Sequence, residues 1–145
     1  MNLNADFVDK LRNSGLRPTK QRLKICEVLF NNEKTFHFTI NDLSKIISEK
    51  LSEKISLATV YNTVHAFKKK GYLKEISINS NKSYFDTNTS VHHHFYDEDN
   101  HELIDCDKND LDPINVRNNP TGKKINTVEV LIKVCLLYTS PSPRD

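Results

Sequence analysis

The chain has 145 residues, a hydrophobic fraction of 37% and a formal net charge of +2. This length allows one domain or two small ones, and the modest apolar fraction suggests that a partner subunit completes the buried core. No segment approaches the roughly 20 apolar residues of a membrane-spanning helix, and Met1 to Lys10 lacks the apolar core of a signal peptide. We therefore expect a cytoplasmic protein that does not associate with membranes.

The charge is unevenly distributed along the chain. Residues 1–85 contain 15 Lys and Arg against 8 Asp and Glu, whereas residues 86–145 contain 6 against 11. A basic half suits a polyanion such as DNA, and an acidic, histidine-rich half suits metal cations. The three cysteines, Cys26, Cys106 and Cys135, form no C-x-x-C pair, which argues against a disulfide framework or a cysteine-rich zinc site.

Four helical patterns lead the chain. The first ends near Gly15, and the second begins after Thr19, a good N-cap. The third begins at Thr39-Ile40-Asn41-Asp42, which resembles a capping box with Asp in place of Glu. The fourth begins at Ser56 and ends at Gly71.

The fourth helix has one apolar face and one polar face. A rotation of about 100° per residue predicts an inward face formed by Leu57, Val60, Val64 and Phe67. Small and hydrogen-bonding residues form the outer face, with Tyr61 at its border: Ala58, Thr59, Asn62 and Ala66. Such a face can enter the major groove of DNA, although an ordinary amphipathic surface helix is the alternative.

Strand-like segments follow the helices. Tyr72 to Ile78 and Ser83 to Asp86 flank a turn-forming cluster of Asn, Ser and Lys, and helices followed by such a hairpin are the order of a winged helix. A short strand is predicted at Glu102 to Asp105 and a longer one, by alternation, at Val128 to Val134. Pro113 argues against a helix over residues 110–116.

Half of the six histidines stand together at His92-His93-His94. Neutral imidazole is a common ligand for zinc, copper, nickel and iron, so the run predicts a metal site, and a solvated turn is the alternative.

The last ten residues, 136–145, are a Ser- and Pro-containing tail that is predicted to be disordered. This tail resembles translated sequencing-adapter sequence, so it is a candidate for non-native sequence and carries no functional weight.

Three groups of residues are distinctive in combination: Leu16-Arg17-Pro18-Thr19-Lys20-Gln21-Arg22, Ser56-Leu57-Ala58-Thr59-Val60-Tyr61-Asn62-Thr63, and Tyr84-Phe85-Asp86 followed by the histidine run. Together they resemble the ferric uptake regulator family. Within the family the likeness is greatest to the iron-response regulators called Irr. The resemblance implies a dimeric transcription factor of the α+β class, with an N-terminal winged helix-turn-helix and a small C-terminal α/β dimerisation domain. The domains are then expected at residues 1–86 and 87–135.

The resemblance also implies a regulatory metal site that joins the two domains. The matching positions are His37, Asp86, His92, His94 and Asp105. Nitrogen and oxygen ligands without thiolate suit Fe(II) or Mn(II), with Zn able to take their place. His93 is a candidate ligand for a second metal or haem, and the alternative is a histidine in a turn with no ligand. His65 and His101 are expected to be surface residues.

The chain departs from the family in several places. Where a first cysteine pair of the usual structural zinc site would follow the histidine run, the chain has residues 95–100, so dimer stability must rest on packing. Thr127 stands where many relatives have a histidine, which argues against a second complete metal site. Asn62 replaces a common Arg and could bond adenine, implying a different operator. An N-terminal Cys-Pro haem motif is absent.

The functional prediction is a homodimeric repressor that binds double-stranded DNA, responds to metal or haem and controls iron or haem metabolism genes; it is not an enzyme. Major-groove contacts are assigned to Ala58, Thr59, Tyr61 and Asn62. Contacts to phosphates or the minor groove are assigned to Arg17, Lys20 and Arg22, with Lys82 on the wing.

The sequence leaves three alternative functions, and it does not determine the effector, the sign of its effect or the operator. A peroxide sensor of the same family is the first alternative. A metal-dependent hydrolase lacks a plausible spare acid or base and leaves the helix over residues 56–70 unexplained. A metal buffer that does not bind DNA is the third.

Overall fold

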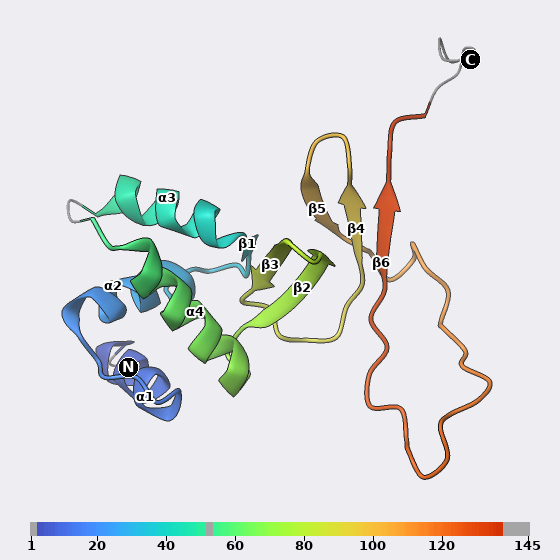
Figure 1. The fold of residues 1–145 in the computed structure, drawn as a ribbon, viewed down its shortest axis with the longest axis horizontal. Coiled ribbons are helices and arrows are strands. Elements are labelled where there is room, and N and C mark those ends of the chain that lie inside the picture. Colours follow the sequence, from blue (N-terminus) through green and yellow to red (C-terminus); the bar gives the residue numbers. More distant parts are fainter. Residues whose placement is uncertain (1–2, 52–53, 138–145) are drawn as a thin grey trace. The chain divides into compact units, whose positions relative to one another are not determined.

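The computed structural model describes residues 3–51 and 54–137, and the chain divides into two compact units, Met1–Thr89 and Ser90–Asp145. Within the described residues, the first unit contains four helices and a three-stranded sheet, and the second contains another three-stranded sheet (Figure 1). Of the predicted disordered tail, residues 138–145 lie outside the described residues, and Leu136 and Leu137 are exposed.

The helices of the first unit are α1 (Leu3–Asn13), α2 (Lys20–Phe30), α3 (Ile40–Lys50) and α4 (Leu57–Lys70). The last three begin directly after the cap residues that the sequence predicts. The side chain of Thr19 accepts a hydrogen bond from Arg22 N at 3.3 Å, and Ser56 Oγ accepts one from Thr59 N at 3.2 Å. Thr39 and Asp42 each accept a backbone N–H of the other at 3.1 Å, so the predicted capping box is confirmed.

Gly71 ends α4 in the left-handed region, with φ 94°, and its N–H donates to the carbonyls of Lys68 and Phe67. We expect Gly71→Ala to lower the free energy of unfolding by about 1 kcal/mol, because an L side chain is strained at this φ. A Cβ at Gly71 would have no atom within 4 Å, so crowding adds nothing to this cost. Denaturant unfolding measures the effect, and Gly71→Asn should be milder because Asn tolerates this region better. Equal stability of the Ala variant and the wild type would contradict this account.

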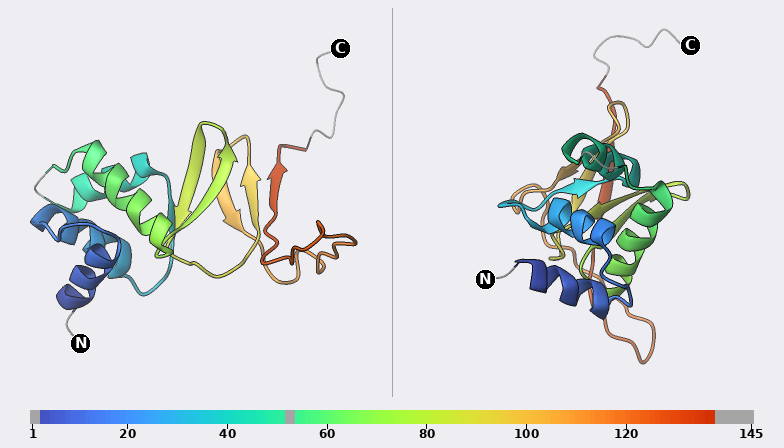
Figure 2. Two further views of the ribbon diagram at one scale, coloured as in Figure 1. Left: turned by 60° about the horizontal axis from the view of Figure 1, so that its bottom comes forward. Right: turned by 90° about the vertical axis from the view of Figure 1, so that its left-hand side faces the viewer.

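The sheet of the first unit has the order β1-β3-β2, with both pairings antiparallel. Its strands are β1 (His37–Phe38), β2 (Lys74–Asn79) and β3 (Lys82–Asp86), and the β2–β3 hairpin is the predicted wing (Figure 2). Phe38 and Phe85 are register partners that pack into the helical core. The core otherwise consists mainly of helix residues: Leu11, Ile25, Leu29, Leu43, Ile47, Val60, Val64 and Phe67.

One residue of the predicted inward face of α4 was assigned wrongly. Leu57 is 51% exposed, whereas Thr63, which the pattern did not place inward, is fully buried. Thr63 is accommodated because its hydroxyl donates to the Thr59 carbonyl at 2.7 Å. Helical periodicity gives the direction of a side chain but not how far the neighbouring core extends, and Leu57, the first residue of the helix, lies beyond it.

The second unit is a sheet of order β5-β4-β6, formed by β4 (His94–Asp97), β5 (Glu102–Asp105) and β6 (Leu131–Val134). β4 pairs antiparallel with β5 and parallel with β6. The strand predicted at Val128 to Val134 is shorter than expected because its partner β4 has only four residues. Residues 106–130, all of them described, contain turns but no helix. These helices and strands confirm the predicted α+β class and the predicted N-terminal winged helix.

Candidate functional site

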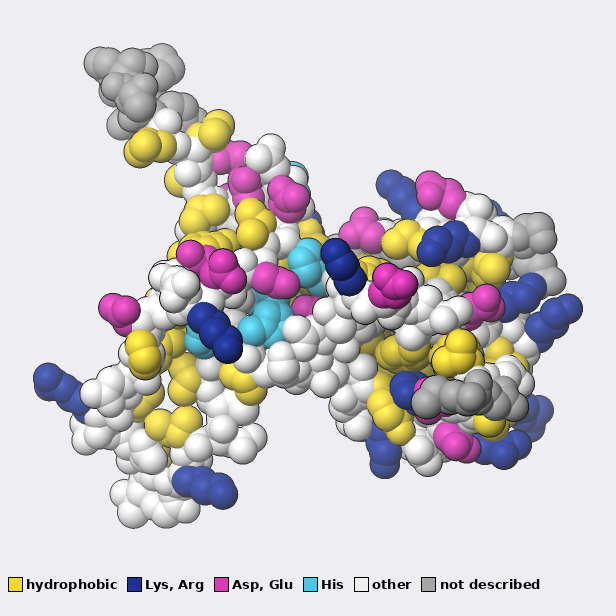
Figure 3. Space-filling model, turned by 180° about the vertical axis from the view of Figure 1, so that it is seen from behind, with side chains coloured by type: hydrophobic (Ala, Val, Ile, Leu, Met, Phe, Trp, Pro, Cys, Tyr) yellow, Lys and Arg dark blue, Asp and Glu magenta, His cyan; other side chains and the backbone are white. Residues whose placement is uncertain are grey.

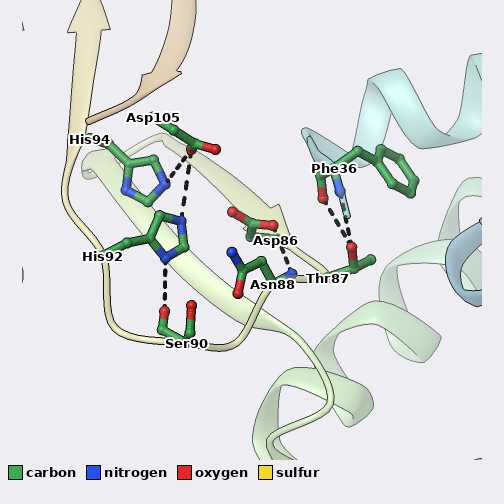
Figure 4. Close-up of polar contacts among 8 residues, drawn as sticks. All are labelled: Phe36, Asp86, Thr87, Asn88, Ser90, His92, His94 and Asp105. Atoms are coloured by element: carbon green, nitrogen blue, oxygen red, sulfur yellow. Dashed lines mark hydrogen bonds and ion pairs between the residues drawn. The ribbon is translucent and has the colours of Figure 1, made fainter. Parts of the chain in front are cut away.

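Three side chains of the predicted metal site come together in the second unit (Figure 4). One ligand atom each from His92, His94 and Asp105 lies within 4.8 Å of the others. Asp105 Oδ1 lies 3.2 Å from His94 Nε2 and 3.8 Å from His92 Nε2, and the two imidazole centroids are 4.3 Å apart. Two nitrogens and a carboxylate that converge in this way can bind a divalent cation.

Strand geometry explains why these three residues converge. Side chains two apart on an extended chain share a face, so His92 and His94 point the same way and His93 points the opposite way. In the β4–β5 hairpin His94 is the register partner of Asp105, which brings the carboxylate to the same place. The cluster therefore depends on the pairing register as well as on the histidine spacing.

His92 is held in the tautomer that a metal ligand needs. Its Nδ1 lies 2.8 Å from the carbonyl oxygen of Ser90. A carbonyl oxygen only accepts, so Nδ1 carries the hydrogen and, in the neutral ring, Nε2 presents its lone pair toward Asp105. A backbone carbonyl that fixes the second ring nitrogen is the usual support of a metal-binding histidine.

His93 has a different set of contacts. Its Nδ1 accepts a hydrogen bond from the backbone N–H of Val130 at 2.9 Å, and His94 N–H donates to the Val130 carbonyl at 3.0 Å. With Nδ1 acting as an acceptor, the proton of the neutral ring is on Nε2, which is then a donor and not a ligand. A metal or haem at His93 would require the other tautomer and the loss of the bond to Val130.

The remaining two candidate ligands are neighbours in the first unit. His37 on β1 and Asp86 at the end of β3 are register partners. Asp86 is 2% exposed, and its Oδ1 accepts a hydrogen bond from Asn88 N at 2.8 Å. The His37 ring makes an edge contact with Tyr84, whose ring centroid is 5.9 Å away. The sheet thus brings together two residues that lie 49 positions apart.

Two cysteines, Cys26 and Cys106, have thiols with raised pKa values. Cys106 follows Asp105, and burial, followed by the negative charges of Asp110 and Asp105, raises its pKa. Burial also raises the pKa of Cys26, to about 12, against a smaller opposing effect of Lys10. Neither thiol belongs to the cluster that contains His92, His94 and Asp105, so the donors that converge there are nitrogen and oxygen atoms.

The segment that stands in place of the cysteine pair forms β4 and its turn. The Asp97 carboxylate accepts hydrogen bonds from the backbone N–H groups of Asp99 and Asn100 and from the Asn100 side chain. Those from the backbone and side chain of Asn100 contribute most to holding the pKa of Asp97 below its ordinary value. Hydrogen bonds to the Asp97 carboxylate thus close this hairpin.

The predicted DNA-reading residues of helix α4 differ in how exposed their side chains are. Ala58, Tyr61 and Asn62 are exposed, whereas Thr59 is half-buried and its hydroxyl lies 2.9 Å from Ser56 Oγ. A hydroxyl shared with the helix cap is less available to a base than the side chains of Tyr61 and Asn62. These last two are the strongest candidates for direct reading.

The predicted phosphate contacts lie in the first unit. Lysine and arginine side chains are spread over the surface of this unit in the view of Figure 3. Arg17 and Lys20 are exposed. The guanidinium of Arg22 donates to the Arg17 carbonyl at 3.0 Å and so stabilises the segment that leads into α2. Lys82 lies on the wing with its ammonium 5.5 Å from the Tyr84 ring centroid.

Sequence reasoning missed two residues that support these groups. Ser90 orients His92 through its backbone carbonyl, which no side-chain pattern reveals. His65 was left as a surface residue, but its ring contacts both Tyr61 and Phe85. The spacing of four residues between Tyr61 and His65 on a helix was the signal that could have indicated this contact.

Within the described residues, none of the helices has the length and apolar character needed to cross a membrane.

Comparisons with known proteins agree with this arrangement. A sequence model of the ferric uptake regulator family matches residues 13–134. The peroxide-responsive repressor of Staphylococcus epidermidis is 33% identical over 109 residues, covering 75% of this chain and 71% of that protein. The ferric uptake regulation protein of Yersinia pestis is 39% identical over 98 residues, covering 68% and 62%. The fold also resembles a solved ferric uptake regulator of Pseudomonas aeruginosa with manganese, at a TM-score of 0.64, 21% identity, and 90% and 97% coverage.

Proposed function

Because the chain belongs to the ferric uptake regulator family, we propose that it is a homodimeric repressor whose binding to double-stranded DNA is set by a metal ion or haem. The family consists of metal-responsive transcriptional regulators, and the chain is a regulator and not an enzyme. As a regulator of bacterial genes it would act in the cytoplasm. The iron-response regulators, to which the motifs in residues 57–63, 85–88 and 92–95 are similar, suggest iron or haem metabolism genes as targets.

The convergence of His92, His94 and Asp105 is the observation that carries this proposal. We propose that His37 and Asp86 complete the set, since only five residues separate Asp86 from His92 along the chain. A single ion held by both groups would restrain residues 1–86, the proposed DNA-binding domain, relative to residues 87–135, the proposed metal-binding and dimerisation domain. Such restraint would set the spacing of two recognition helices in a dimer.

The donor set favours Fe(II) or Mn(II). Three imidazoles and two carboxylates are borderline and hard ligands, and a site with five protein ligands differs from the closed tetrahedral sites that structural zinc prefers. Zinc can still occupy such a site in place of either metal. Manganese is present in the Pseudomonas aeruginosa structure of a related fold. Haem is a further candidate effector, although the bond between His93 and Val130 would have to break for His93 to bind it.

DNA would be read by α4 and held by basic residues around it. Tyr61 and Asn62 would contact base edges, with Ala58 and Thr59 allowing close approach. Arg17, Lys20 and Arg22 would contact phosphates or the minor groove, and Lys82 would do so from the wing. Phosphate contacts position the protein, whereas the base contacts would specify its operator.

Selection of bound genomic DNA with the purified protein tests this function directly. The protein is incubated with fragmented genomic DNA alone, with Fe(II), with Mn(II), or with haem, and the retained fragments are sequenced. We expect one shared two-fold symmetric motif whose enrichment changes with at least one effector. Enrichment of no motif under any of the four conditions would contradict the proposal.

A peroxide sensor is the second candidate, because a peroxide-responsive repressor is among the relatives above 30% identity. Both acidic candidates at the site, Asp86 and Asp105, are aspartates. If the Fe(II) protein senses peroxide, brief peroxide treatment should add oxygen to His37 or His92, detectable by peptide mass spectrometry. Unmodified histidines after treatment, with the Zn(II) protein as the redox-inactive control, would remove this candidate.

A further inference from the structure

The rings of Tyr61 and His65 lie against each other on α4. They are one helical turn apart, their centroids are 4.1 Å apart, and their planes are inclined by 37°. Tyr61 is 51% exposed, whereas His65 is half-buried. One face of an otherwise exposed tyrosine is therefore covered by a histidine that is itself held by its surroundings.

His65 is in turn held by the sheet of the first unit. Its ring meets Phe85 edge-on, with centroids 5.3 Å apart and planes inclined by 77°. Phe85 is 2% exposed and stacks on Phe38, 6.2 Å away. A buried aromatic pair is a rigid support, because core side chains are closely packed in single rotamers.

Phe85 immediately precedes Asp86, and Phe38 immediately follows His37. Neighbouring residues of a strand point to opposite faces, so the aromatic pair and the candidate ligand pair lie on opposite faces of the same two strands. The contact chain from Tyr61 through His65 to Phe85 therefore ends one residue away from the candidate metal ligands.

Glu75 is a further neighbour of His65. Glu75, the register partner of Phe85, forms an ion pair with Lys68 at 3.4 Å. Burial raises the pKa of Glu75, but hydrogen bonds from Ser83 and Lys68 and the charges of Lys68 and His65 outweigh it and lower the pKa overall. His65 therefore interacts electrostatically with Glu75 in addition to its two ring contacts.

We propose that His65 is a positioning residue that holds the Tyr61 ring ready for the operator and links it to the strands that carry His37 and Asp86. The inference rests on the proposed reading of DNA by Tyr61. A free tyrosine loses rotamer freedom when it contacts DNA, whereas a ring already stacked in place loses less, so the stack increases affinity. The same stack would transmit a shift of β1 and β3 to the DNA-reading face.

The test uses His65→Ala and His65→Phe, each in the wild-type and the Tyr61→Ala background. In the absence of DNA, the ring signals of Tyr61, assigned by NMR with Tyr61→Phe, should move in His65→Ala. Affinity for the selected operator should fall about 2- to 10-fold in His65→Ala and be retained in His65→Phe, which keeps an aromatic ring at this position. In the Tyr61→Ala background, His65→Ala should cause no further loss.

His101→Ala is the matched control, since His101 also contacts a tyrosine, Tyr96 at 3.3 Å, but lies in the second unit. It should leave operator affinity unchanged. Unmoved Tyr61 signals in His65→Ala, or an equal loss of affinity in both backgrounds, would overturn the inference and leave the proposed function intact. Wild-type operator affinity of Tyr61→Ala itself would instead overturn the proposed reading by Tyr61, and the inference with it.

Discussion

Replacing His92 and His94 together with alanine is expected to lower metal affinity by more than about 100-fold, because loss of even a supporting contact costs 10- to 100-fold. Operator binding should then no longer change when Fe(II) or Mn(II) is added. The reason is geometric: both Nε2 atoms face Asp105 Oδ1, at 3.8 and 3.2 Å, so the double variant leaves the carboxylate without its two nearest nitrogen partners in the cluster. Calorimetric metal titration and DNA binding with and without metal measure the two effects.

His93→Asn is the matched control for this experiment. An asparagine oxygen can take the place of His93 Nδ1 and accept the Val130 N–H. The hydrogen bond between position 93 and Val130, the residue before β6, is then kept. This variant should retain both metal affinity and the metal response of DNA binding. A metal response that persists in the His92 and His94 double variant would move the regulatory site elsewhere. Loss of the response in His93→Asn alone would instead assign His93 to the regulatory site.

Local structure was the part of the fold that the sequence predicted best. Thr39 and Asp42 lie three residues apart, and the side chain of each accepts the backbone N–H of the other, so their capping box is set by the local sequence. The end of α4 at Gly71 is equally local, because it depends on one residue's φ. Strand β4 was missed because its four residues include His94 and Asp97 at its ends and show no clear polar alternation.

The site was predictable only in part from local pattern. The two-residue spacing of His92 and His94 places them on one face of an extended chain, but the contact with Asp105 follows from the hairpin register. His37 and Asp86 are brought together by a pairing between distant strands, which no periodicity reveals, and the family resemblance supplied them. The contact of His65 with Phe85 depends on how α4 packs on the sheet, so it emerged only with the structure.

Replacing Tyr61 and Asn62 together with alanine should remove operator specificity and leave metal binding unchanged. Each base contact contributes about 1–3 kcal/mol, so the loss of two should weaken operator binding by about 30-fold or more. Both side chains are exposed, so the fold should persist, and Arg17 and Lys20 should still support non-specific binding. Competition between operator and random duplexes at fixed salt measures specificity, and calorimetric metal titration measures metal binding.

The matched control is Asn118→Ala, which removes an exposed asparagine from the second unit and should alter neither property. Two results would contradict the separation of roles between the units. If the Tyr61 and Asn62 double variant still prefers its operator by the wild-type ratio, the reading surface lies outside these two positions of α4. If it loses metal affinity instead, α4 contributes to the metal centre, and DNA reading and metal sensing share residues rather than communicating through β1 and β3.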